Sequence, residues 1–103
     1  MIEKFTLYVG LNDKDSKVQE VSTLEAYKII NKLLLSYTDG ATIFEADGIY
    51  KHEDGTFVIE KTLRIELLFV EKSTVKKIVE EIKKLLNQES VAVQREVVES
   101  ELW

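Results

Sequence analysis

The chain begins with a regular alternation of apolar and polar residues. Between Lys4 and Asn12, every second residue is apolar, and the intervening positions include Thr6, Tyr8 and Gly10. A period of two places alternate side chains on opposite faces of a strand. The segment therefore predicts a β-strand with one buried face, formed by Phe5, Leu7, Val9 and Leu11.

Two segments show helical spacing instead. In the first, 22–38, Ser22 and Glu25 form a capping box, and Gly40 is expected to follow the helix end in a left-handed conformation. In the second, 73–88, Ser73 is the predicted N-cap. Each helix has one apolar stripe for a core. The stripes are Ala26, Tyr27, Ile30, Leu33, Leu34 and Tyr37, and Val75, Ile78, Val79, Ile82, Leu85 and Leu86.

Two further alternating runs, 41–52 and 56–70, flank Asp54-Gly55, a dipeptide typical of two-residue hairpin turns. Such a turn pairs Phe44 with Ile65 on an apolar face. It pairs Glu45 with Arg64 on the other face, as a cross-strand ion pair. We expect the helix-free face of the sheet to carry Thr6, Tyr8, Ile43, Glu45, Asp47, Ile49, Glu60, Thr62, Arg64 and Glu66.

A last strand is predicted over 90–98, which completes the order β-α-β-β-α-β. This order predicts an α+β, ferredoxin-like βαββαβ sandwich spanning residues 1–103 as a single domain. Right-handed crossovers give a four-stranded antiparallel sheet of order 4-1-3-2, with both helices on one face. Each arm of the central β-hairpin spans roughly 35 Å, and the first helix only roughly 25 Å. The long hairpin should therefore project beyond the helices.

The projecting hairpin and the C-terminus would leave large apolar side chains exposed in a monomer, and exposed patches of this kind mark interfaces. We therefore predict a homo-oligomer, either a homotrimer or a homodimer. Trp103 fits an intersubunit contact and a pocket in its own subunit equally well. The predicted interface residues are Tyr50, His52, Phe57, Ile59 and Trp103.

The amino-acid composition and the net charge restrict the kinds of partner that the protein could bind. The 103 residues are 45% hydrophobic and 32% charged, as in a folded protein, and carry a net charge of −5. An acidic chain disfavours nucleic-acid binding, which needs a positive surface. No apolar run is long enough for a membrane span, and the N-terminus lacks the features of a signal peptide. The absence of cysteine excludes disulfides and thiolate sites. We expect a cytoplasmic protein with no nucleic-acid or membrane partner.

Two polar clusters raise the question of a metal site. His52, Glu53 and Asp54 are consecutive, but neighbouring strand residues point to opposite faces, and zinc requires three or four ligands. Asp13 and Asp15 have the spacing that opens a calcium loop, but the glycine and bidentate glutamate do not follow. The sequence therefore predicts neither a metal nor a cofactor.

A ligand site is predicted on the helix-free face and the neighbouring loop. Tyr8, Glu45, Arg64 and Glu66 could bind a polar ligand there, or could form an ion pair buried between subunits. Lys14 and Lys17, in the loop 12–21, are candidate anion contacts. No serine has a neighbouring histidine in sequence, so we predict no catalytic residue.

The βαββαβ order, the long hairpin and the C-terminal strand resemble the PII-like superfamily, which includes the CutA-like proteins. The resemblance implies a small trimeric protein that binds nucleotides, metals or other ligands between subunits and acts as a regulator. The stretch "YVGLNDKD" resembles the start of small uncharacterised proteins of bacteria, phages and plasmids. No binding residue is carried over from either resemblance.

The function expected from these features is that of a non-enzymatic, oligomeric regulatory protein. It would hold a small anionic ligand, such as a nucleotide or a nucleotide-derived signal, in clefts between subunits. One alternative is an acidic protein-protein inhibitor or adaptor, encoded by a phage or mobile element and acting against host defence. A second alternative is a small ferredoxin-like enzyme.

Overall fold

A computed structural model describes residues 1–51 and 53–103. His52 lies outside the described residues, so the expectations placed on it remain predictions. The elements are β1 (Ile2–Gly10), α1 (Thr23–Tyr37), β2 (Thr42–Lys51), β3 (Phe57–Leu68), α2 (Lys72–Leu85) and β4 (Ala92–Val98).

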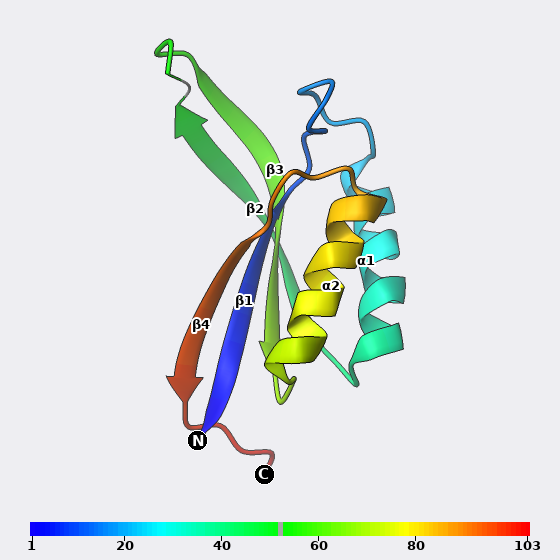
Figure 1. Cartoon of the computed structure of the whole chain (residues 1–103), viewed down its shortest axis with the longest axis vertical. Coiled ribbons are helices and arrows are strands. Elements are labelled where there is room, and N and C mark those ends of the chain that lie inside the picture. Colours follow the sequence, from blue (N-terminus) through cyan, green and yellow to red (C-terminus); the bar gives the residue numbers. More distant parts are fainter. Residues whose placement is uncertain (52) are drawn as a thin grey trace.

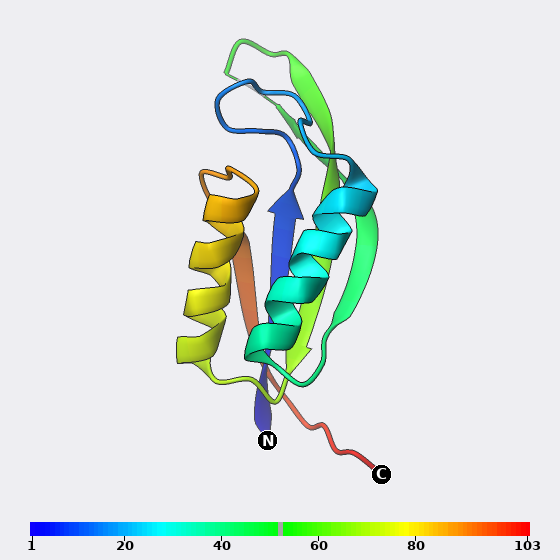
Figure 2. The same ribbon diagram turned by 90° about the vertical axis from the view of Figure 1, so that its right-hand side faces the viewer.

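The strands form one antiparallel sheet in the order β2-β3-β1-β4. Both helices cover the same face of this sheet, and the opposite face, which we call the open face, carries no helix (Figures 1 and 2). This is the ferredoxin-like arrangement, and its strand order is the predicted 4-1-3-2 read from the other edge.

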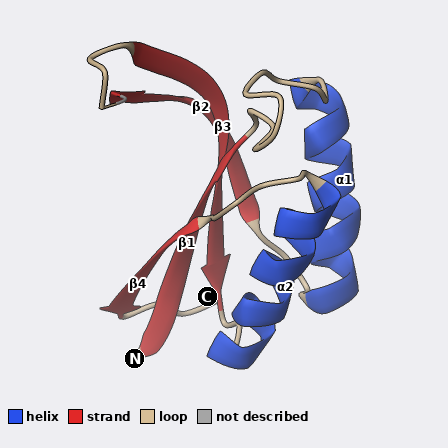
Figure 3. Cartoon of the chain, turned by 45° about the horizontal axis from the view of Figure 1, so that its top comes forward, coloured by secondary structure: helices blue, strands red, loops and turns tan. Residues whose placement is uncertain are grey.

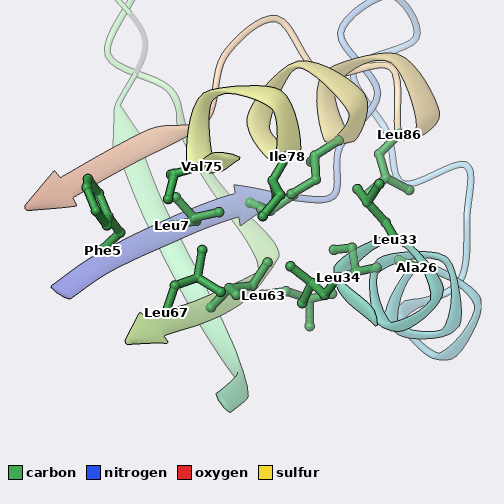
Figure 4. Close-up of a cluster of buried hydrophobic side chains, with 14 of the residues drawn as sticks. Phe5, Leu7, Ala26, Leu33, Leu34, Leu63, Leu67, Val75, Ile78 and Leu86 are labelled. Carbon is green, nitrogen blue, oxygen red and sulfur yellow. The ribbon is translucent and has the colours of Figure 1, made fainter. Parts of the chain in front are cut away.

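The core lies between the helices and the sheet, where side chains of both layers meet (Figure 4). The predicted buried face of β1 is confirmed, since Phe5, Leu7 and Val9 are at most 2% exposed. In α1, Ala26, Ile30, Leu33 and Leu34 are buried as predicted. Tyr27 and Tyr37, at the margin of the predicted stripe, are each 38% exposed.

The observed helix ends agree only in part with those predicted from the sequence. The Ser22 hydroxyl accepts a hydrogen bond from the Glu25 N–H at 3.1 Å, which confirms the first N-cap. The prediction for Ser73 is wrong, because α2 already begins at Lys72 and Glu71 takes the N-cap position. The prediction for Gly40 is also wrong. An extended Thr38 ends α1, and its N–H donates to the Leu34 carbonyl, so no left-handed glycine is needed.

The hairpin register is shifted by one residue from the prediction. Phe44 lies opposite Arg64, Glu45 opposite Leu63, and Asp47 opposite Lys61. The predicted Glu45–Arg64 ion pair is therefore wrong, and the observed cross-strand pair joins Lys61 Nζ to Asp47 Oδ1 at 2.9 Å. The predicted open-face residues from β2 are wrong for the same reason. Ile43, Glu45, Asp47 and Ile49 lie on the side of the sheet that faces the helices.

The turn explains the shift. Lys51 pairs with Phe57, so the connection is longer than the predicted two residues. A two-residue type I′ turn requires a positive φ at both central residues. Gly55 has a φ of 90°, but Asp54 is not among the residues with positive φ. Asp54 Oδ1 accepts hydrogen bonds from the Thr56 N–H at 2.9 Å and the Thr56 hydroxyl at 2.6 Å. These bonds close a wider loop.

The hairpin formed by β2 and β3 projects past the helical layer, as expected (Figures 1 and 3). Its outer part exposes apolar side chains: Ile49 is 72% exposed, Phe57 67% and Ile59 60%. Tyr50, on the opposite face of the same hairpin, is 43% exposed.

Within the described part of the chain, neither helix combines the length and the apolar character that crossing a bilayer would require.

Candidate functional site

A cluster of polar and aromatic side chains occupies the middle of the open face. Its centre is Arg64 of β3, whose neighbours across the strands are Tyr8 of β1 and Phe44 of β2. The Arg64 Cζ atom lies 6.0 Å from the centroid of the Tyr8 ring and 5.5 Å from that of Phe44. Both distances are in the range of cation–π contacts. The two rings thus flank the guanidinium group.

Two cations share one carboxylate at this place. Glu66 Oε2 lies 2.8 Å from Arg64 Nη2 and 3.2 Å from Lys4 Nζ. Counting these three groups together, one positive charge is left without a partner. The Arg64 Nε atom is buried and has no hydrogen-bond partner among the described residues, which costs free energy unless an acceptor from outside the chain, water included, bonds to it. We call Lys4, Tyr8, Phe44, Arg64 and Glu66 the Arg64 cluster.

The strand β4 extends the polar surface beside this cluster. The Tyr8 hydroxyl donates to Gln94 Oε1 at 3.3 Å, and Gln94 lies opposite Thr6. Thr6 is only 1% exposed although it lies on the open face. The open face is therefore partly covered by its own long side chains.

The structure brings together Tyr8, Arg64 and Glu66 from the predicted ligand residues. It separates Glu45 from them, because Glu45 pairs with Leu63 on the other side of the sheet. Lys14 and Lys17 are exposed, and no interaction within residues 1–51 and 53–103 links their side chains to the Arg64 cluster.

Sequence reasoning missed Lys4, Phe44 and Gln94. Lys4 could have been found, since it continues the alternation that places Thr6 and Tyr8 on one face. The pattern alone places Phe44 in the core, because the predicted hairpin register differs by one residue from the observed one. Gln94 gives no signal in the sequence that distinguishes it from an ordinary solvent-facing strand residue.

The loop 12–21 is held by its own side chains. Asp13 Oδ2 accepts the N–H groups of Asp15 and Ser16 at 2.9 and 3.1 Å. The Asn87 side-chain amide donates to Asp13 Oδ1 at 2.9 Å and to Asp15 Oδ2 at 2.8 Å. Donation from Asn87, followed by the backbone N–H groups of Ser16 and Asp15, lowers the pKa of Asp13 below its ordinary value. Asp13 and Asp15 thus fasten the loop to Asn87, which lies just after the C-terminal end of α2.

Within the part of the chain that the structure describes, no three His, Cys, Asp or Glu side chains are grouped so that they could hold a metal ion. The Asp13–Asp15 pair, the candidate with the best spacing, is engaged by Asn87 instead.

Residues 4–101 match the family model described as "Protein of unknown function (DUF3574)". The chain belongs to the DUF3574 family. No curated protein matches this DUF3574 chain in sequence. The family assignment by itself names no ligand and no reaction.

Solved structures resemble this DUF3574 protein in fold. A phage SAM lyase in complex with S-methyl-5′-thioadenosine has a TM-score of 0.71 and 20% identity, over 92% of this chain and 80% of that chain. The periplasmic divalent cation tolerance protein CutA from Archaeoglobus fulgidus has a TM-score of 0.67 and 14% identity, over 99% and 88%. CutA1 from Oryza sativa has a TM-score of 0.61 and 16% identity, over 98% and 84%.

Identities of this size show the fold alone. They confirm the predicted resemblance to the CutA-like proteins at that level. The functions named for these structures belong to those proteins, and the site of the DUF3574 chain has to be argued from its own residues.

Proposed function

We propose that this protein is a non-enzymatic, oligomeric regulatory protein that binds a small anionic ligand, such as a nucleotide, between subunits. The Arg64 cluster is the anion contact, and self-association through the projecting hairpin encloses it. In this proposal the protein acts in the cytoplasm, and neither nucleic acid nor a membrane is its partner.

The observation that carries the proposal is the state of Arg64. Its guanidinium group is flanked by two aromatic rings, shares its only described carboxylate partner with Lys4, and has a buried Nε atom without a hydrogen bond. A phosphate or carboxylate group would balance the surplus charge, and arginine recognises such groups through paired N–H donors. The Phe44 ring, with 45% of the residue exposed, offers a surface for a planar base beside it.

Self-association is supported by the apolar surface of the hairpin and by the C-terminus. Leu102 and Trp103 have relative exposures of 90% and 108%, so neither is covered by its own subunit. The expected contacts are Tyr50, Phe57, Ile59 and Trp103, with His52 as a further contact that the described residues do not test. The resemblance to the CutA-like proteins implies a trimer, and the shared ferredoxin-like fold supports that resemblance.

Calorimetric titration with adenosine monophosphate tests the binding proposal, and adenosine is the uncharged control. The Arg64→Ala variant should weaken binding of the nucleotide at least tenfold, equivalent to about 1.4 kcal/mol. The affinity of Arg64→Lys for the nucleotide should lie between that of the unchanged protein and that of Arg64→Ala, because lysine keeps the charge but loses the planar donor group. Arg95→Ala is the matched control, since Arg95 contacts Glu3 and is not part of the cluster. Absence of binding for a series of nucleotides would contradict the proposal.

A second candidate function follows from one specific likeness. Among the structures compared, the phage SAM lyase has a TM-score of 0.71 to this chain, and its ligand is a nucleoside. An enzyme that acts on S-adenosylmethionine is therefore the alternative. Incubation with S-adenosylmethionine, followed by chromatography for S-methyl-5′-thioadenosine, distinguishes the two. Turnover above the spontaneous rate would favour the enzyme proposal. Binding without turnover would favour the regulatory protein.

A further inference from the structure

A cleft of about 650 Å³ lies at the end of the sheet remote from the hairpin tip. It is bordered by the C-terminal end of α1, the end of β3 and the start of α2. The C-terminal segment 99–103 leaves β4 and passes below this end of the molecule (Figure 2), and its Leu102 lines the cleft. A volume of this size suits a small organic ligand.

The lining of the cleft is acidic. It contains three carboxylates, Asp39, Glu66 and Glu71, and no lysine, arginine or histidine among the described residues. Glu66 is neutralised by Lys4 and Arg64. The carboxylates of Asp39 and Glu71 make no hydrogen bond or ion pair within the described chain, and Glu71 does not cap α2 with its side chain. Two unbalanced negative charges therefore border the cleft.

The helix α1 adds to this negative potential. Its last residue, Tyr37, and the C-cap residue Thr38 line the cleft, and its last turn has no basic residue to offset the partial negative charge of a helix C-terminus. An anion would be repelled here, whereas a cation would be attracted from several directions.

Aromatic side chains supply a second, independent feature. Tyr37 and Phe69 both line the cleft, and 52% of Phe69 is exposed. Aromatic rings combined with carboxylates are the usual surroundings of bound organic cations.

We propose that this cleft binds a small organic cation with an apolar body, of the quaternary ammonium class. Asp39 and Glu71 provide the charge, and Tyr37 and Phe69 provide the aromatic surface. Leu102 covers the ligand from the C-terminal segment. The cleft and the Arg64 cluster share Glu66, but the charge offered to the cation comes from Asp39 and Glu71, which are not part of the cluster.

The protein carries a reporter for this site. Trp103 is the only tryptophan of the chain and directly follows Leu102. The test compares choline with its neutral isostere 3,3-dimethyl-1-butanol, by Trp103 fluorescence and by calorimetry. We expect saturable binding of choline and at least tenfold weaker binding of the alcohol. Equal affinities, or no heat and no fluorescence change with choline, would overturn the proposal.

Variants locate the binding within the cleft. Asp39→Asn and Glu71→Gln should each weaken choline binding several-fold and leave the affinity of the alcohol unchanged. Glu89→Gln is the matched control, because Glu89 is an exposed carboxylate outside the cleft. If Glu89→Gln weakened choline binding as much as Glu71→Gln, the attraction would come from the net charge of −5 and the cleft assignment would be wrong.

Discussion

Among single residues, Gly10 has the clearest packing requirement. A Cβ atom at this position would lie 2.5 Å from Glu60 Oε1 and 2.8 Å from Glu60 Oε2. The Glu60 carboxylate is placed over Gly10 because its Oε2 accepts the Asn12 N–H at 3.0 Å. This bond ties the start of the loop 12–21 to the projecting part of β3. A glycine at position 10 is thus what lets Glu60 reach the loop.

The Gly10→Ala variant should lose up to about 1 kcal/mol of unfolding free energy, because Glu60 must swing away and release the Asn12 N–H. In a Glu60→Ala background the same change should be neutral or stabilising, since nothing is then displaced. Urea denaturation of the two single variants and the double variant measures this coupling. Gly40→Ala is the control, as no atom lies within 4 Å of its added methyl group. Strictly additive effects would refute the contact.

Elements differed in how well the sequence specified them. The strand β1 was predicted with the correct faces because its apolar residues occupy one face only. In β2, apolar residues lie on both faces, with Ile43 and Ile49 on one and Phe44 and Tyr50 on the other. Its pattern is therefore compatible with two registers, and the turn decides between them. The register error also affects the predicted ligand site, which wrongly includes Glu45 and leaves out Phe44.

Paired cysteines test the register, in a chain that has no cysteine of its own. Ile49 lies directly opposite Ile59, so the variant Ile49→Cys with Ile59→Cys should form a disulfide on mild oxidation. Tyr50→Cys with Ile59→Cys is the control, since these positions point to opposite faces in this register. Preferential bridging of the control pair, measured by peptide mass mapping, would restore the register expected from the Asp54-Gly55 turn.

In the whole molecule, the hairpin reaches beyond the two-layer body (Figure 3). Its side chains Ile49, Phe57 and Ile59 are exposed. The longest dimension, 47 Å, is nearly twice the next, 26 Å. An arm of this shape cannot bury its apolar surface within one copy, which is why we assign it to contacts between copies. The sequence predicted this feature from element lengths alone, but element lengths cannot say whether two or three copies assemble.

Phe57→Asp should therefore lower the apparent mass in sedimentation, because a carboxylate would replace a ring at the subunit contact. Leu35→Glu is the matched control: Leu35 is 71% exposed on α1, away from the hairpin, and its replacement should leave the mass unchanged. An equal effect of both variants would indicate general charge repulsion and not a specific hairpin contact.

Native mass spectrometry of the protein taken gently from cell extract tests the central claim most directly, because it reports subunit number and retained ligand together. The proposed function predicts a dimer or trimer that carries an anionic small molecule, and loss of that added mass in Arg64→Ala with the oligomer intact. A bare monomer at micromolar concentration, or an added mass that persists unchanged in Arg64→Ala, would contradict it.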